Sequence, residues 1–224
     1  MPTRSLVPTA EEPLSAASSP PAHPTNAPRH PPFSIGRWIV AVTSGEALGF
    51  AFVAAVALTV VGSALEDPWR YLVLVGAGAV EGATLGAAQL AGMGARRPDP
   101  SKWIGATALG AALAWAIGLL PSTLGLPLAM PLGMVLVVAG ATALLASIPV
   151  LQWLVIRRRT HSKRWIPVNM GAWAIAILWT FAPSPIVDDS TEIAVLLGIY
   201  TAAGLLMAAT VAALTARSAS TLFS

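Results

Sequence analysis

Long apolar runs follow one another along this chain, and short segments rich in charged residues, glycine or proline separate them. A helix that rises 1.5 Å per residue needs about 20 residues to cross a hydrocarbon core roughly 30 Å thick. The runs are continuous rather than alternating and rich in Ala, Leu and Gly, which argues against the strands of a β-barrel. The pattern predicts an all-α transmembrane protein with spans at 38–62, 69–93, 103–120, 131–156, 165–181 and 193–216.

The third and fifth runs are the shortest, so their ends are the hardest to place. We expect both to span the membrane, because a buried soluble helix of this composition would need far more surrounding protein than the chain provides. The segment before the first run carries nine prolines in residues 1–32 and has no apolar core. We therefore predict a disordered cytoplasmic tail (1–34), a transmembrane domain (35–217) and a short cytoplasmic tail (218–224).

Composition agrees with this assignment and removes several classes of site. The chain is 55% hydrophobic and only 10% charged, whereas about a quarter of an ordinary soluble domain is charged. It contains no cysteine, which excludes disulfides and thiolate metal sites. The histidines His23, His30 and His161 have no metal-ligand spacing. No metal and no cofactor are predicted.

The positions of the cations predict an orientation. Lys and Arg accumulate on the cytoplasmic side of short membrane loops. With both termini inside, only Arg70 remains outside, so we predict an N-in, C-in protein of the bacterial cytoplasmic membrane. The cytoplasmic set is Arg4, Arg29, Arg37, Arg96, Arg97, Lys102, Arg157, Arg158, Arg159, Lys163, Arg164 and Arg217.

The basic run RRRTHSKR at 157–164 admits two interpretations. It resembles a nucleic-acid patch, but a short loop between two spans has little reach. We favour a topology determinant that also touches anionic lipid head groups. The expected partners are thus the lipid bilayer, its anionic head groups and an unidentified membrane protein, with no nucleic acid.

Three runs open with a cation followed by tryptophan, at spacings of 65 and 62 residues. Tryptophan prefers the head-group level and the cation stays in the aqueous layer, so these pairs are interpreted as interfacial anchors. A glycine follows each, at Gly45, Gly110 and Gly171. The three pairs are Arg37 with Trp38, Lys102 with Trp103, and Arg164 with Trp165.

The returning runs carry a weaker version of the same repeat. Gln89 precedes Arg96, and Gln152 precedes Arg159 at the same interval, 63 residues later. The sixth run has no glutamine. Because each pair of runs leaves and returns on the same side, the pattern predicts three parallel two-helix hairpins arranged as a six-helix bundle.

Small residues at helical spacing predict where the helices approach closely. Association in lipid depends on such residues, because the apolar tails of lipid compete with larger side chains. The ladder Ala106, Gly110, Ala114, Gly118 is one example, and Gly204, Ala208 and Ala212 form another. The glycines assigned to helix packing are Gly45, Gly49, Gly78, Gly82, Gly86 and Gly110.

The segments EGATLGAAQ, KWIGATALGAALAW, LLPS, QWLVIRRR and RWIP together resemble a set of uncharacterised bacterial multi-pass membrane proteins with repeated Gln, Arg and Trp hairpin signatures. The resemblance covers about residues 37–180. It departs from the usual pattern at AGMGARR, where an apolar run ending in Leu-Arg is expected. It implies a helical membrane fold and brings no activity.

Two acids lie inside predicted spans. At the helical rise, Glu46 is about 12 Å and Glu81 about 20 Å from the cytoplasmic face, and no Lys or Arg lies at their depth. A charged carboxylate facing lipid is costly, so both should turn inward as neutral acids. Two interpretations stay open, a helix–helix hydrogen bond and a proton or cation pathway. The hydrogen-bond partners considered are Ser44, Thr84, Asn169 and Gln152.

Gln89, Gln152 and Asn169 are expected to form hydrogen bonds between hairpins. No acidic cluster, Ser-His-Asp set or phosphate-cradling loop is present, so an enzyme, such as one that modifies lipids, is not expected. The sequence predicts a structural or accessory membrane component. The alternative is a small proton- or cation-coupled transporter or channel that uses Glu46 and Glu81.

Overall fold

The computed structural model describes residues 31–61, 63–125, 131–187 and 191–224. Within these ranges it contains six α-helices and no strand. The prediction for residues 1–30 lies outside the described residues. The α-helices are α1 (Ile35–Val61), α2 (Trp69–Gly92), α3 (Pro100–Thr123), α4 (Pro131–Ile156), α5 (Trp165–Ala176) and α6 (Ile193–Phe223), with 3-10 turns η1 (Ser162–Arg164) and η2 (Ile177–Thr180).

Five helices, α1 to α4 and α6, are long and apolar enough to cross a membrane, which confirms the helical membrane class. The fifth predicted span, 165–181, is different. Its α-helix, α5, has only 12 residues and tightens into η2 before the chain turns. Pro183 and Pro185 follow within nine residues of Ala176, and proline cannot continue a helix.

Residues 218–224, predicted as a short tail, are instead the end of α6, which continues to Phe223. The chain from Leu205 onward contains no Gly or Pro that would end the helix. The Phe223 side chain is fully buried. Burial of this aromatic ring therefore holds the last two turns in place.

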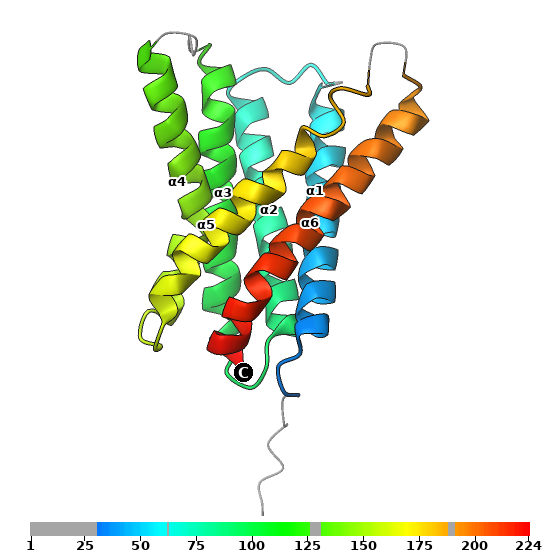
Figure 1. The fold of residues 1–224 in the computed structure, drawn as a ribbon. Coiled ribbons are helices and arrows are strands. Elements are labelled where there is room, and N and C mark those ends of the chain that lie inside the picture. Colours follow the sequence, from blue (N-terminus) through cyan, green and yellow to red (C-terminus); the bar gives the residue numbers. More distant parts are fainter. Residues whose placement is uncertain (1–30, 62, 126–130, 188–190) are drawn as a thin grey trace, which may run out of the picture.

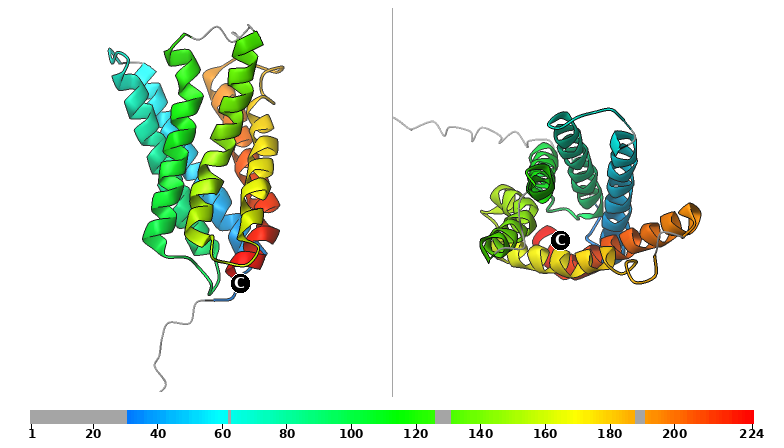
Figure 2. Two further views of the ribbon diagram at one scale, coloured as in Figure 1. Left: turned by 90° about the vertical axis from the view of Figure 1, so that its left-hand side faces the viewer. Right: turned by 90° about the horizontal axis from the view of Figure 1, so that it is seen from above.

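The six helices form a ring in chain order (Figures 1 and 2). Each helix packs against the next one along the chain, and α6 returns to pack against α1. Helices α1 to α4 stand nearly upright, whereas α5 and α6 cross the open side of the ring at an angle. All inward-facing side chains therefore point toward one shared interior.

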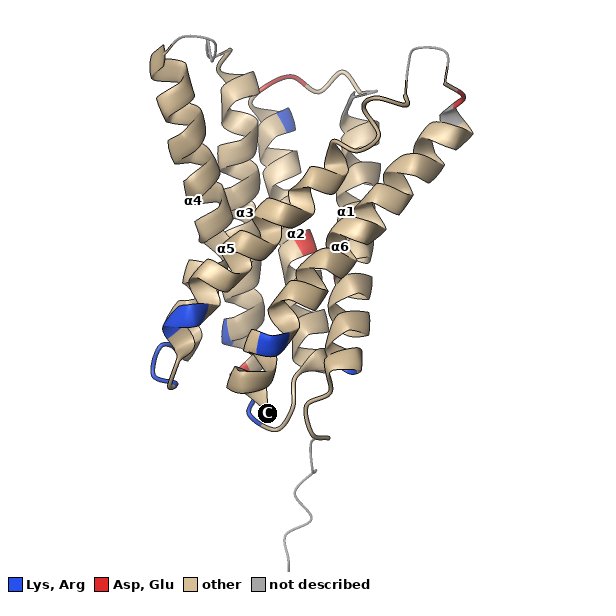
Figure 3. Ribbon diagram, in the orientation of Figure 1, with Lys and Arg blue, Asp and Glu red and all other residues tan. Residues whose placement is uncertain are grey.

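Charge is distributed unevenly between the two ends of this ring (Figure 3). Among the described residues, every Lys and Arg except Arg70 lies toward the end where α1, α3 and α5 begin and α2, α4 and α6 finish. We call this the basic end. At the start of α3, the Asp99 carboxylate accepts hydrogen bonds from the Lys102 backbone N–H and the Ser101 hydroxyl, and these bonds lower its pKa.

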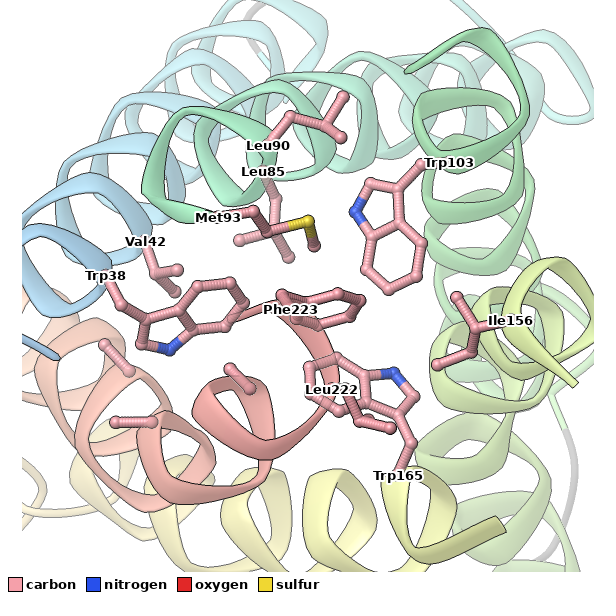
Figure 4. Close-up of a cluster of buried hydrophobic side chains, with 13 residues drawn as sticks. Trp38, Val42, Leu85, Leu90, Met93, Trp103, Ile156, Trp165, Leu222 and Phe223 are labelled. Carbon is pink, nitrogen blue, oxygen red and sulfur yellow. The ribbon is translucent and has the colours of Figure 1, made fainter. Parts of the chain in front are cut away.

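The largest buried side chains meet at the basic end. Trp38, Trp103 and Trp165 are fully buried, and Phe223 lies between their rings (Figure 4). Ring centroids are 5.5 Å from Phe223 to Trp103, 5.6 Å to Trp165 and 6.3 Å to Trp38. We call these four residues the tryptophan cluster. The helices converge on it, so it closes the ring at this end.

Close helix contacts occur at the six glycines assigned to packing. A methyl group added at Gly110 would lie 2.6 Å from Ile148 Cα, and at Gly82 it would lie 2.6 Å from the Thr107 carbonyl oxygen. The same atom at Gly45, Gly49, Gly78 and Gly86 would come within 2.0 to 3.1 Å of a neighbouring helix. Gly171 differs, because it is exposed with nothing nearby, and the buried Ala172 occupies the equivalent inward position.

We predict that Gly110→Ala destabilises the bundle and that Gly105→Ala on the same helix does not. The new methyl at position 110 meets backbone, which cannot move aside, so overpacking should cost about 1 to 3 kcal/mol. Nothing lies within 4 Å of the matched position at Gly105. Thermal unfolding of the purified proteins in detergent measures the difference, and equal midpoints for both variants would contradict the close contact.

Candidate functional site

The three indole N–H groups of the tryptophan cluster all donate to side chains on a neighbouring helix. Trp103 Nε1 donates to Gln89 Oε1 at 3.0 Å, and Trp165 Nε1 donates to Gln152 Oε1 at 2.9 Å. Trp38 Nε1 donates to Thr215 Oγ1 at 3.2 Å. Each odd-numbered helix is thereby bonded to an even-numbered one.

Thr215 was not identified from the sequence, which lacks a glutamine in the sixth run. It lies 63 residues after Gln152, the same interval that separates Gln152 from Gln89. A threonine hydroxyl accepts a hydrogen bond as an amide oxygen does. Extending the 63-residue interval once more would have found it.

Gln152 connects two of these bonds into one network. Its Nε2 donates to Gln89 Oε1 and to Thr107 Oγ1, both at 2.8 Å. The Thr107 hydroxyl in turn donates to the Trp103 carbonyl oxygen. Asn169 does not join this network, because its side-chain amide donates to the Trp165 carbonyl on its own helix.

The tryptophans expected at the lipid interface thus lie inside the bundle, whereas their neighbouring cations remain at its surface. Lys102 and Arg164 are exposed. Arg37 is half-buried, and its Nη2 donates to the Met93 carbonyl at 2.9 Å. The physical reason is the acceptor on each facing helix, which lets an indole be buried without losing its hydrogen bond.

Arg159 fastens the end of α6 to the same cluster. Its Nη1 donates to the Leu222 carbonyl at 3.0 Å and to the Arg96 carbonyl, and its guanidinium lies 5.5 Å from the Phe223 ring centroid. Burial and the nearby Arg96 charge lower its pKa. This basic residue is therefore part of the closed end, rather than free to bind a ligand.

The two acids predicted inside spans line one cavity of about 350 Å³. Glu46 on α1 is 2% exposed and Glu81 on α2 is 8% exposed. The cavity wall also includes Thr180 and residues of all six helices. Two acids that are 35 positions apart in the sequence thus share one enclosed space.

Trp115, which the sequence did not single out, is the partner of Glu81. Its Nε1 donates to Glu81 Oε2 at 2.6 Å. The indole fits because α2 carries Gly78 opposite it, where an added methyl would lie 2.0 Å from Trp115 Cδ1. The glycine at this position therefore makes room for the ring that orients Glu81.

Glu46 has an electrostatic neighbour in Glu81 and makes no hydrogen bond with any part of the chain that the structure describes. The partners expected from the sequence bond elsewhere. Gln152 and Asn169 belong to the basic end, and the Thr84 hydroxyl donates to its own helix at the Val80 carbonyl. Glu46 is consequently a buried acid that faces the cavity without a protein partner.

The cavity is closed toward the basic end. Leu85 belongs to both the cavity wall and the packed core around the tryptophan cluster, so it separates the two. The wall residues farthest from that end include Gly118, which is exposed, and Thr180, which is half-exposed. The cavity therefore opens in the half of the bundle away from the tryptophans.

Apart from its two acids, the cavity is mostly apolar and aromatic. Phe50, Trp115 and Trp173 contribute rings, and the aliphatic wall includes Ile148 and Met207. No Lys, Arg, His or Asp lines it. Among the described residues, no group of three or more His, Cys, Asp or Glu could hold a metal ion.

We predict that Gln152→Leu and Trp165→Phe each destabilise the protein and that their effects are not additive. Removing one partner leaves a buried polar group unsatisfied, at a cost of about 1 to 3 kcal/mol, whereas removing both does not. A double-mutant cycle on unfolding in detergent should show a coupling of about 0.5 kcal/mol or more. Ser122→Ala, which removes an exposed hydroxyl, is the control, and full additivity would contradict the bond.

Comparison with protein-family models, with curated proteins and with solved structures finds no significant match to this chain. The functional argument therefore depends on the geometry of the site. That geometry is a water-sized to ligand-sized space, two buried carboxyl groups and a closed end.

Proposed function

We propose that this protein exchanges protons for a cation across a membrane, with Glu46 and Glu81 as the exchanging groups. The observation that supports this proposal is that both acids line the same cavity. Acids that served only as helix–helix hydrogen bonds would each contact a partner on a facing helix. Glu46 instead faces open space.

The physical basis for exchange is the cost of charge in an apolar cavity. A carboxylate within a membrane is tolerated when it is protonated or paired with a cation. With no basic side chain in its wall, the cavity has to take either a proton or a cation from outside. Occupation by one of these therefore excludes the need for the other.

We further propose that the ring consists of three parallel hairpins with both termini on the cytoplasmic side of a bacterial inner membrane. The three bonds from tryptophan to Gln89, Gln152 and Thr215 support a repeat, and the ring order of the helices supports its parallel form. The concentration of cations at one end supports the orientation. The exposed cations there favour contact with anionic lipid head groups.

We predict that purified protein in liposomes carries a proton flux driven by a cation gradient and that Glu81→Gln abolishes it. Glutamine keeps the shape of the side chain but cannot release a proton. A pH-sensitive dye inside the liposomes measures the flux. Glu66→Gln, which neutralises an exposed acid outside the cavity, is the matched control and should retain full flux.

The accessory role predicted from the sequence remains the alternative to transport. It requires a membrane-protein partner and no flux. Equal flux in wild type and Glu81→Gln would overturn the exchange proposal. If crosslinking in native membranes then recovered a stable partner, that result would favour the accessory role.

We predict that single cysteines report opposite sides at the two ends of the bundle. The chain has no native cysteine, so each substitution is unique. Ala64 and Thr160 are exposed, the first beyond the end of α1 and the second in the basic loop after α4. In intact cells, a membrane-impermeant maleimide should label Ala64→Cys at once and Thr160→Cys only after permeabilisation. The reverse result would invert the proposed orientation.

A further inference from the structure

We propose that the occupant of the acidic cavity is a lipophilic organic cation, with an ammonium or similar group next to Glu81 and an apolar body against the aromatic wall. This inference deepens the proposed function, on which it rests, by naming the class of cation. It follows from the shape and chemistry of the cavity wall.

A bare metal ion fits the wall poorly. Hard cations take six or more oxygen ligands in proteins. The wall supplies four carboxylate oxygens, of which Glu81 Oε2 already accepts from Trp115, and the Thr180 hydroxyl. A cavity of about 350 Å³ is also far larger than an ion needs, and lies in the range of small-molecule sites.

An apolar cation fits on each count. The faces of tryptophan and phenylalanine attract a cation within about 6 Å, and this attraction is strongest away from water. Three rings, Phe50, Trp115 and Trp173, line the cavity together with aliphatic groups that suit an apolar body. The two carboxyl groups supply the opposite charge. A neutral or anionic ligand would leave that charge unanswered.

The exchange balances as one cation in and one proton out. When the cavity is empty, both acids hold their protons. A cation with a fixed charge binds, Glu81 releases its proton to water, and its carboxylate pairs with the cation. The Trp115 N–H stabilises that carboxylate, whereas Glu46 keeps its proton because it has no such donor.

The groups that could titrate at this site are few. Every helix contributes to the wall, and Glu46 from α1 and Glu81 from α2 are its only acids. The other helices present apolar side chains, two indoles and the Thr180 hydroxyl. A proton released on binding can therefore be assigned to the glutamate pair.

Benzyltrimethylammonium and neopentylbenzene test the inference, because the two molecules have the same shape and only the first is charged. The charged molecule has no proton of its own to release. Titration calorimetry of the full-length protein in detergent, run in two buffers of different ionisation enthalpy, measures affinity and proton release together. We expect the cation to bind and release about one proton, and the neutral isostere to bind at least about thirty-fold more weakly.

Variants assign the roles of the two side chains. Glu81→Gln should weaken cation binding at least about thirty-fold and abolish proton release. Trp115→Phe keeps an aromatic ring but loses the N–H donor, and should weaken binding roughly tenfold. Glu66→Gln is the control and should bind as the wild type does. If Glu81→Gln fails to fold, Trp115→Phe and the matched ligand pair still decide the matter.

Two results would overturn the inference. Equal binding of the cation and its neutral isostere would make the cavity a merely apolar pocket. A cation that fails to bind at millimolar concentration would exclude this ligand class. If proton flux still depended on Glu81 in that case, the exchange proposal would stand with a different cation. Binding with proton release but without flux would instead support the ligand and overturn transport.

Discussion

The bundle is organised by the need of three buried indole N–H groups to find acceptors. A tryptophan buries more apolar area than any other side chain, yet its N–H must be bonded when water is excluded. Gln89, Gln152 and Thr215 meet that need from facing helices. A change in register of any helix would break one of these bonds. The tryptophan cluster thus fixes the relative height of the helices and closes one end of the ring.

The cavity is a consequence of closing the ring at that end only. Helices α5 and α6 cross the upright helices at an angle, so they cannot fill the ring along its whole length with side chains. Gly45 and Gly49 on α1, and Gly78 and Gly82 on α2, let neighbouring helices approach closely around the acids. Small residues in the wall and divergence of the helices together leave the space that Glu46 and Glu81 line.

Sequence reasoning recovered the helices well, because apolar runs and charge positions are local properties. It also found both acids and both glutamines. It missed Trp115, Thr107 and Thr215, since nothing local marks which tryptophan or threonine faces inward. It placed Trp38, Trp103 and Trp165 at the lipid interface, the general preference of this residue, because the acceptor on the facing helix is a tertiary feature. The helical end of α6 was missed because a tail rich in Ser and Thr gives no sign that Phe223 is buried.

On the proposed repeat, the acids distinguish the first hairpin from the other two. Positions 65 and then 62 residues after Glu46 hold Ala111 and Trp173, and positions 63 and 126 residues after Glu81 hold Leu144 and Met207. All six side chains line the same cavity. The closed end therefore retains three similar sets of contacts, whereas the cavity carries acid on one side and apolar or aromatic groups on the other two. This asymmetry would orient a cation with its charge toward α1 and α2 and its apolar body toward α3 to α6, which a symmetric ring of acids could not do.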